Sequence, residues 1–99
     1  MSYPDTVPSN VGSPEDDRRK LRVRIMRQLC PKDANARHNG RPTDFPIDED
    51  LRGGYDVLYL NRELPIFQND TGYIQILPNG RITLTDTGRQ HCNDPDEAF

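Results

Sequence analysis

Apolar and polar residues alternate over two short stretches near the end of the chain. In residues 74–76 and 82–84 every second residue is isoleucine or leucine. A period of two is typical of a strand with one buried face. The Asn79-Gly80 pair between the stretches favours a type I′ turn, because both residue types tolerate positive φ. We therefore predict a β-hairpin whose buried face contains Ile74, Ile76, Ile82 and Leu84.

A short helix is predicted directly after this hairpin. Thr85 precedes Asp86 and can cap a helix with its side-chain oxygen. Gly88 would let that helix approach the sheet closely, because glycine has no Cβ. Gly72 would allow the backbone to turn from a preceding helix into the hairpin.

A longer helix is predicted near the start of the chain, from Pro14 to Leu29. Ser13 is a good N-cap, proline suits the first helical position, and Pro31 follows as a stop signal. A helix with 3.6 residues per turn has its apolar and charged residues on separate sides. Its buried stripe would contain Leu21, Ile25, Met26 and Leu29, and its opposite, cationic side Lys20, Arg24 and Arg27.

The middle of the chain divides into a loop and two helices. Residues 30–46 contain many Pro, Gly and Asn residues and few apolar ones, which predicts a long loop. Residues 47–52 and 55–64 have helical patterns separated by two glycines, and Pro65 is expected to end or kink the second helix. The apolar stripe of that helix would contain Val57, Leu60, Leu64 and Phe67, and a second stripe Tyr55, Tyr59 and Arg62.

Composition limits the size of the core. The chain has 99 residues, of which 32% are hydrophobic and none is tryptophan, so one small domain over residues 14–92 is expected. Residues 1–13 have no periodicity and are predicted to form a disordered tail, and residues 93–99 a short acidic tail. No segment is long and apolar enough to span a bilayer, and no signal-peptide-like run is present. A cytoplasmic protein is therefore expected.

The two cysteines, Cys30 and Cys92, are expected to be free thiols in that compartment. With His38 and His91 they would supply four zinc ligands, but the spacing lacks a CxxC or HxxxH unit. We therefore predict no metal site and no cofactor. The sequence also lacks a phosphate-binding glycine loop, a nucleophile elbow and an HExxH motif, so we predict that the protein is not an enzyme.

Four segments together carry a family resemblance. They are residues 48–64, the junction Gly72-Tyr73-Ile74, the hairpin over residues 76–84, and the run Leu84-Thr85-Asp86-Thr87-Gly88-Arg89. In this order they resemble the winged helix-turn-helix fold of small bacterial, archaeal and phage regulators. The resemblance covers about residues 14–92. It implies an α+β fold with three helices, a two-stranded hairpin called the wing, and a short C-terminal helix.

The resemblance also implies a function. In this family the third helix enters the major groove of double-stranded DNA, and the wing approaches phosphates or the minor groove. The expected function is that of a sequence-specific transcriptional regulator that binds a palindromic site as a homodimer. The implied DNA-binding residues are Tyr55, Tyr59, Asn61 and Arg62 in the third helix, with Asn79 and Arg81 in the wing. The alternative is that the tyrosines only cover the edge of the core and the polar residues are only solvated.

Charge is distributed unevenly along the chain. Residues 15–41 contain nine Lys or Arg and four acids, whereas residues 44–70 contain two Arg and seven acids. An acidic helix-turn-helix would oppose DNA binding unless its carboxylates point away or a dimer adds cations. The alternative function is therefore a winged-helix module that binds a protein partner and not DNA. A second surface for phosphates or for a partner would consist of Lys20, Arg24, Arg27, Lys32, Arg37 and Arg41.

Overall fold

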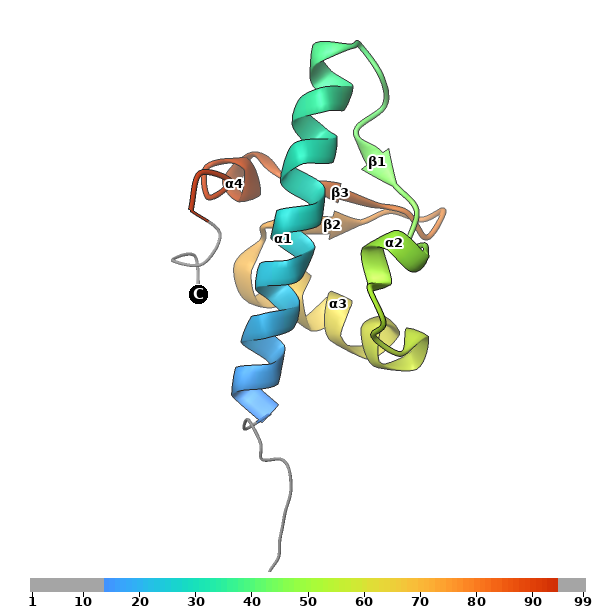
Figure 1. Cartoon of the computed structure of the whole chain (residues 1–99), viewed down its shortest axis with the longest axis vertical. Coiled ribbons are helices and arrows are strands. Elements are labelled where there is room, and N and C mark those ends of the chain that lie inside the picture. The colour runs from blue at the N-terminus through green and yellow to red at the C-terminus, as the bar shows by residue number, and fades with distance from the viewer. Residues whose placement is uncertain (1–13, 95–99) are drawn as a thin grey trace, which may run out of the picture.

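The computed structural model describes residues 14–94 as helices packed against a small antiparallel sheet (Figure 1). The predicted α+β class is confirmed. The predicted N-cap Ser13, the predicted tail over residues 1–13 and residues 95–99 of the acidic tail lie outside the described residues. Within residues 14–94, no helix is both long enough and apolar enough to cross a membrane. The elements in chain order are α1 (Pro14–His38), β1 (Asp44–Phe45), α2 (Glu49–Arg52), α3 (Val57–Thr71), β2 (Ile74–Ile76), β3 (Ile82–Leu84) and α4 (Asp86–Arg89).

Helix α1 begins at Pro14 as predicted but continues to His38 instead of ending near Leu29. Pro31 lies inside the helix on an exposed side, where water can hydrate the carbonyl that loses its backbone donor. Asp33, one half-turn later, is fully buried and fixes the second part of the helix against the rest of the fold. The loop predicted from residue 30 onward is therefore wrong over residues 30–38.

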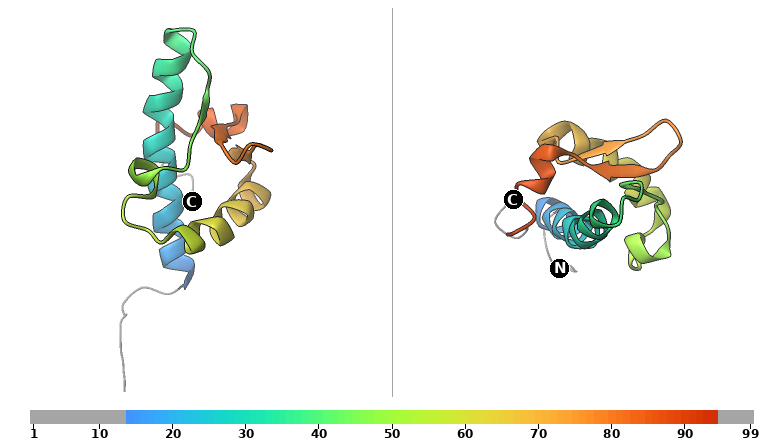
Figure 2. Two further views of the ribbon diagram at one scale, coloured as in Figure 1. Left: turned by 90° about the vertical axis from the view of Figure 1, so that its right-hand side faces the viewer. Right: turned by 90° about the horizontal axis from the view of Figure 1, so that it is seen from above.

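The core lies between α1, α3 and the sheet, which surround it from different sides (Figure 2). The predicted stripe of α1 is confirmed, and the predicted stripe of α3 is confirmed except at its first residue. Val57 is 45% exposed, because α3 starts at this residue and its first turn extends beyond the core. The fully enclosed apolar cluster consists of Leu21, Ile25, Met26, Leu29, Leu51, Leu60, Leu64, Phe67, Ile74, Ile82 and Leu84.

The sheet has three antiparallel strands in the order β1-β3-β2. The predicted hairpin is confirmed, and its register places Ile74 opposite Leu84 and Ile76 opposite Ile82. The two-residue strand β1, which lies in the predicted loop, pairs with the other edge of β3. Its backbone is too short to have a periodic pattern in the sequence, and only the pairing with β3 defines it.

The hairpin turn differs from the predicted type I′ turn. The Gly80 N–H donates to the Leu77 carbonyl at 2.9 Å, so Pro78 and Asn79 are the two central residues of the turn. Proline fixes φ near −65°, which excludes the positive φ that a type I′ turn needs at its first central position. Gly80 follows with φ 84°, the arrangement of a type I turn with a glycine bulge.

Helices α2 and α3 each begin after an aspartate N-cap. The Asp48 side chain accepts a hydrogen bond from the Leu51 N–H, and the Asp56 side chain accepts from the Leu58 and Tyr59 N–H groups. Each helix therefore starts two residues later than predicted. The predicted helix end at Leu64 is wrong, because Pro65 lies on the exposed side and α3 continues past it to its Gly72 C-cap, with φ 70°.

The predicted C-terminal helix is confirmed as α4. Thr85 is its N-cap and accepts a hydrogen bond from the Gly88 N–H at 3.1 Å. A Cβ on Gly88 would overlap the Tyr73 carbonyl oxygen, so the close approach predicted at this glycine is present. The Thr85 hydroxyl also donates to the Gly72 carbonyl. The two ends of the hairpin are therefore fastened to each other as well as to α4.

A disulfide between Cys30 and Cys92 joins α1 to the segment after α4. The prediction of free thiols is wrong, because the fold brings the two Cα atoms to 5.6 Å although 62 residues separate them in sequence. Buried Asp33 lies beside this link and pairs with Arg89 at 3.0 Å and with Arg37 at 2.9 Å. Helix α4 and the residues directly after it are thus held to α1 by one covalent bond and one buried ion pair.

Reduction of the disulfide is expected to lower the free energy of unfolding by about 2–4 kcal/mol, because the bond closes a long loop in the unfolded chain. Urea unfolding with and without a phosphine reductant measures this difference. The Cys30→Ser/Cys92→Ser double variant is the control and should unfold at the same lower midpoint in both conditions. If the urea midpoint of the parent chain is the same with and without the reductant, the two sulfurs are not bonded in solution.

Candidate nucleic-acid interface

The amino-terminal half of α3 has one buried and one exposed side. Leu60, Leu64 and Phe67 face the core, each no more than 2% exposed. The N-cap Asp56 fixes the first turn and thereby the direction in which the opposite side points. That side, called here the α3 outer face, consists of Val57, Leu58, Asn61, Arg62, Pro65 and Asn69, all of which are exposed.

Tyr55, Tyr59 and Arg62 form a stack beside the α3 outer face. The two tyrosine rings lie 5.9 Å apart with nearly parallel planes, and the Arg62 guanidinium lies 5.2 Å from the centre of the Tyr59 ring. Both rings are half-buried against the core. Partial burial and the nearby Glu63 carboxylate raise the pKa of Tyr59 above its ordinary value of 10.0. Both tyrosines therefore cover the core edge, and Tyr59 also contacts the Arg62 guanidinium.

Glu63 is a buried charge that the sequence analysis did not single out. It is 4% exposed and accepts hydrogen bonds from Arg18 Nε at 2.6 Å and from Arg18 Nη2 at 3.3 Å. Arg62 lies 3.4 Å from the same carboxylate. The signal was present in the sequence, since Glu63 falls on the apolar stripe of α3 between Leu60 and Leu64 and a buried acid needs a cationic partner.

The structure gives most acids of residues 44–70 a partner within the chain. Glu63 pairs with Arg18, and Asp70 pairs with Arg22 at 2.8 Å, so two carboxylates of α3 contact α1. Asp48 and Asp56 accept from helix N-termini, which carry partial positive charge. Asp44 pairs with Arg81 at 3.3 Å, and Asp50 lies 3.8 Å from Lys32. Six of the seven acids of this segment therefore have a partner within the chain, and four of these six remain exposed.

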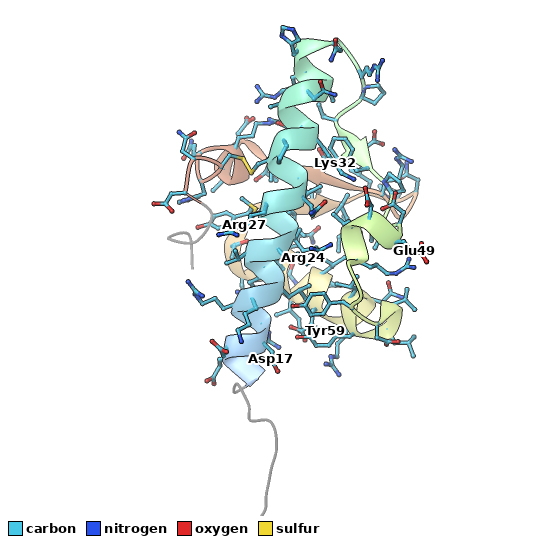
Figure 3. The ribbon with its side chains drawn as sticks, viewed as in Figure 1. Asp17, Arg24, Arg27, Lys32, Glu49 and Tyr59 are labelled. Atoms are coloured by element: carbon cyan, nitrogen blue, oxygen red, sulfur yellow. A yellow bond between two sulfur atoms is a disulfide. The ribbon has the colours of Figure 1, made fainter. Side chains whose placement is uncertain are left out.

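The same contacts use part of the predicted cationic surface of α1. Arg24 lies over Gly53 and donates to the Asp50 carbonyl at 2.9 Å, which fastens α1 to the end of α2. Figure 3 shows Arg24 and Lys32 on the part of α1 beside α2, whereas Glu49 points away from the body. Of the remaining predicted residues, Lys20 pairs with Asp16, Arg37 pairs with Asp33, and Arg27 and Arg41 are exposed.

The predicted wing residues lie at and near the hairpin turn. The Asn79 side chain accepts from the Arg81 N–H at 3.0 Å, so this amide stabilises the turn. The Arg81 side chain donates to the Asp44 carbonyl at 2.9 Å and is 40% exposed. Arg81 therefore joins the hairpin to β1 and keeps part of its guanidinium accessible. Figures 1 and 2 place the hairpin turn, α2 and the start of α3 on one side of α1.

The contacts do not suggest a metal centre. Within residues 14–94 no three His, Cys, Asp or Glu side chains gather closely enough to bind a metal ion.

Comparison of the chain with protein-family models, curated proteins and solved structures finds no match.

Replacing Glu63 with Gln is expected to lower the free energy of unfolding at pH 7 by about 1.5–3 kcal/mol, the range for a hydrogen bond to a charged group. The Arg18 guanidinium holds the pKa of Glu63 below its ordinary value of 4.5. The unfolded chain therefore binds this proton more readily than the folded chain. The stabilisation is complete above pH 4.5 and is lost as the pH falls through the folded-state pKa.

Chemical unfolding between pH 3 and pH 7, roughly the titration range of carboxylates, measures this pH dependence. Glu49→Gln makes the same chemical change at an exposed residue and serves as the matched control. We expect a flatter pH profile for Glu63→Gln than for the parent or for Glu49→Gln. Identical profiles for all three chains would contradict a stabilising Arg18–Glu63 pair.

Proposed function

We propose that this protein is a sequence-specific DNA-binding transcriptional regulator of the winged helix-turn-helix type. The α3 outer face reads base edges in the major groove, and the β2-β3 turn lies against the DNA backbone. The observation that carries the proposal is the composition of the α3 outer face. It presents an amide, a guanidinium and two aliphatic side chains next to one another, while the acids of α3 serve as caps or ion-pair partners.

The arrangement of the elements supports this proposal. A long helix, a short strand, two helices and a hairpin follow one another, and the short strand pairs with the second strand of the hairpin. This order is compatible with a winged helix in which α2 and α3 form the helix-turn-helix. The major groove of B-DNA is about 12 Å wide and admits one α-helix. An exposed α3 is therefore of suitable size and chemistry to enter it.

Side-chain chemistry supports base contacts at two residues. An asparagine amide matches the donor and acceptor of adenine, and an arginine guanidinium donates twice to guanine. Asn61 and Arg62 are adjacent, exposed and supported by the turn that Tyr59 anchors in the core edge. Because one protomer offers few cations on this face, a homodimer on a palindromic site would double the phosphate contacts.

A protein-interaction module is the second candidate, and one observation favours it. Val57 and Leu58 are 45% and 73% exposed at the start of α3, and an aliphatic pair beside polar residues can form part of a protein interface. On this alternative the α3 outer face binds protein and never DNA. The two candidates predict different results in the same titration.

An NMR titration of the labelled protein with random-sequence duplex DNA, at low and at high salt, tests the proposed function. We expect shifts of the amides of residues 55–64 and 79–81 that weaken as salt rises, since phosphate contacts release counterions. Shifts centred on Lys20 and Arg27 would move the nucleic-acid surface to α1. No shift at any salt concentration would overturn DNA binding in favour of the protein-interaction module.

Arg62→Ala is expected to weaken binding to the preferred duplex by roughly 1–3 kcal/mol and to relax discrimination at one base pair. Arg62→Lys retains the charge but not the two-pronged donor geometry, so it should lose discrimination while keeping the salt dependence. Arg27→Ala, the matched control on α1, should leave discrimination unchanged. Fluorescence anisotropy with the preferred duplex and with single-base variants measures all three, and equal discrimination by parent and Arg62→Ala would contradict the assigned role of Arg62.

A further inference from the structure

Two aliphatic side chains protrude from the first turn of α3. Leu58 is 73% exposed and Val57 is 45% exposed, and they are the exposed large hydrophobic residues of the described part of the chain. The remaining large aliphatic residues of α3 are buried or half-buried against the core. The pair is therefore accessible for contact with another molecule.

The start of the helix fixes the positions of both side chains. Asp56 accepts hydrogen bonds from the Leu58 N–H at 3.0 Å and from the Tyr59 N–H at 3.2 Å, so the first turn is ordered by its cap. Leu58 lies three and four residues before Asn61 and Arg62, and residues at this spacing are neighbours on one helix face. The aliphatic pair thus borders the two polar side chains that are suited to base edges.

The size of the patch decides what it can contact. Stable protein interfaces bury about 800 Å² on each partner and involve about 20–30 residues on each side. Val57 and Leu58 would be a small part of such an interface, and polar residues such as Asn61 and Arg62 would have to supply much of the rest. In the major groove, by contrast, the only apolar group on a base edge is the C5-methyl of thymine, and one aliphatic side chain is enough to cover it.

We infer that Leu58, with Val57 beside it, contacts a thymine methyl group in the major groove, next to the base pairs read by Asn61 and Arg62. This inference rests on the proposed function and deepens it. It assigns thymine-containing duplexes as the preferred ligand. It also assigns part of the specificity to burial of an apolar group, which does not depend on salt as phosphate contacts do.

The experiment first selects preferred duplexes from a random pool with the full chain and then replaces each thymine of the selected site with deoxyuridine. This substitution removes one methyl group and leaves the base pairing unchanged. We expect an affinity loss of about fourfold at one or two positions, the effect of withdrawing one methyl group from an apolar contact. Leu58→Ala should bind the parent site more weakly and be insensitive to deoxyuridine at those positions.

Asn61→Ala is the matched control on the same face and should keep its sensitivity to deoxyuridine, because it leaves the aliphatic pair intact. Circular dichroism spectra of each variant establish that α3 is folded. Binding of the selected duplex with no methyl-sensitive position would overturn this inference and leave the proposed function standing. Failure to select any duplex would overturn the proposed function and this inference together.

Discussion

The packing of the α1 apolar stripe against the sheet and α3 is the constraint on which the rest of the fold depends. Leu21, Ile25, Met26 and Leu29 are at most 1% exposed, and they cover the apolar face of a hairpin that would not be stable alone. Burial of apolar area is the dominant favourable term in folding. Because the core is small, the position of α1 decides where every later element can lie.

The packing of α1 also brings basic residues of α1 to acidic residues of α3. Once α1 lies across the core, Arg18 and Arg22 come to the carboxylates of Glu63 and Asp70. Exposed ion pairs contribute little to stability, but the buried Glu63 would be costly without its partner. The pairing also gives four of the seven acids of residues 44–70 a basic partner within the chain, although Asp50 and Asp70 stay exposed.

The α3 outer face is the side of the helix that remains exposed after these contacts are made. One side of α3 is buried in the core. Asp56 caps the helix, and Glu63 and Asp70 form ion pairs with α1. Tyr59 has a double role, because its ring closes the core edge and supports Arg62. Of the two interpretations of these tyrosines drawn from the sequence, core cover is observed, and a DNA-binding role is compatible with it.

The sequence alone determined the features that depend on neighbouring residues. The α1 stripe, the hairpin, the Thr85 cap and the close approach at Gly88 were all predicted, because periodicity, capping and the absence of a Cβ act locally. Local rules failed at Pro31 and Pro65, where exposed positions in helices fixed by the core tolerate a proline. The DNA-contacting roles of the predicted site residues are still predictions.

Only the tertiary structure decided the contacts between distant residues. These are the pairing of β1 with β3, the Cys30–Cys92 disulfide, the burial of Asp33 with Arg89, and the partners of the acidic segment. The tertiary structure also left Leu58 exposed at the first turn of α3. The physical reason is the same for all of them. Burial and pairing depend on which surfaces come into contact in the folded chain, and the spacing of residues along the sequence does not specify these contacts.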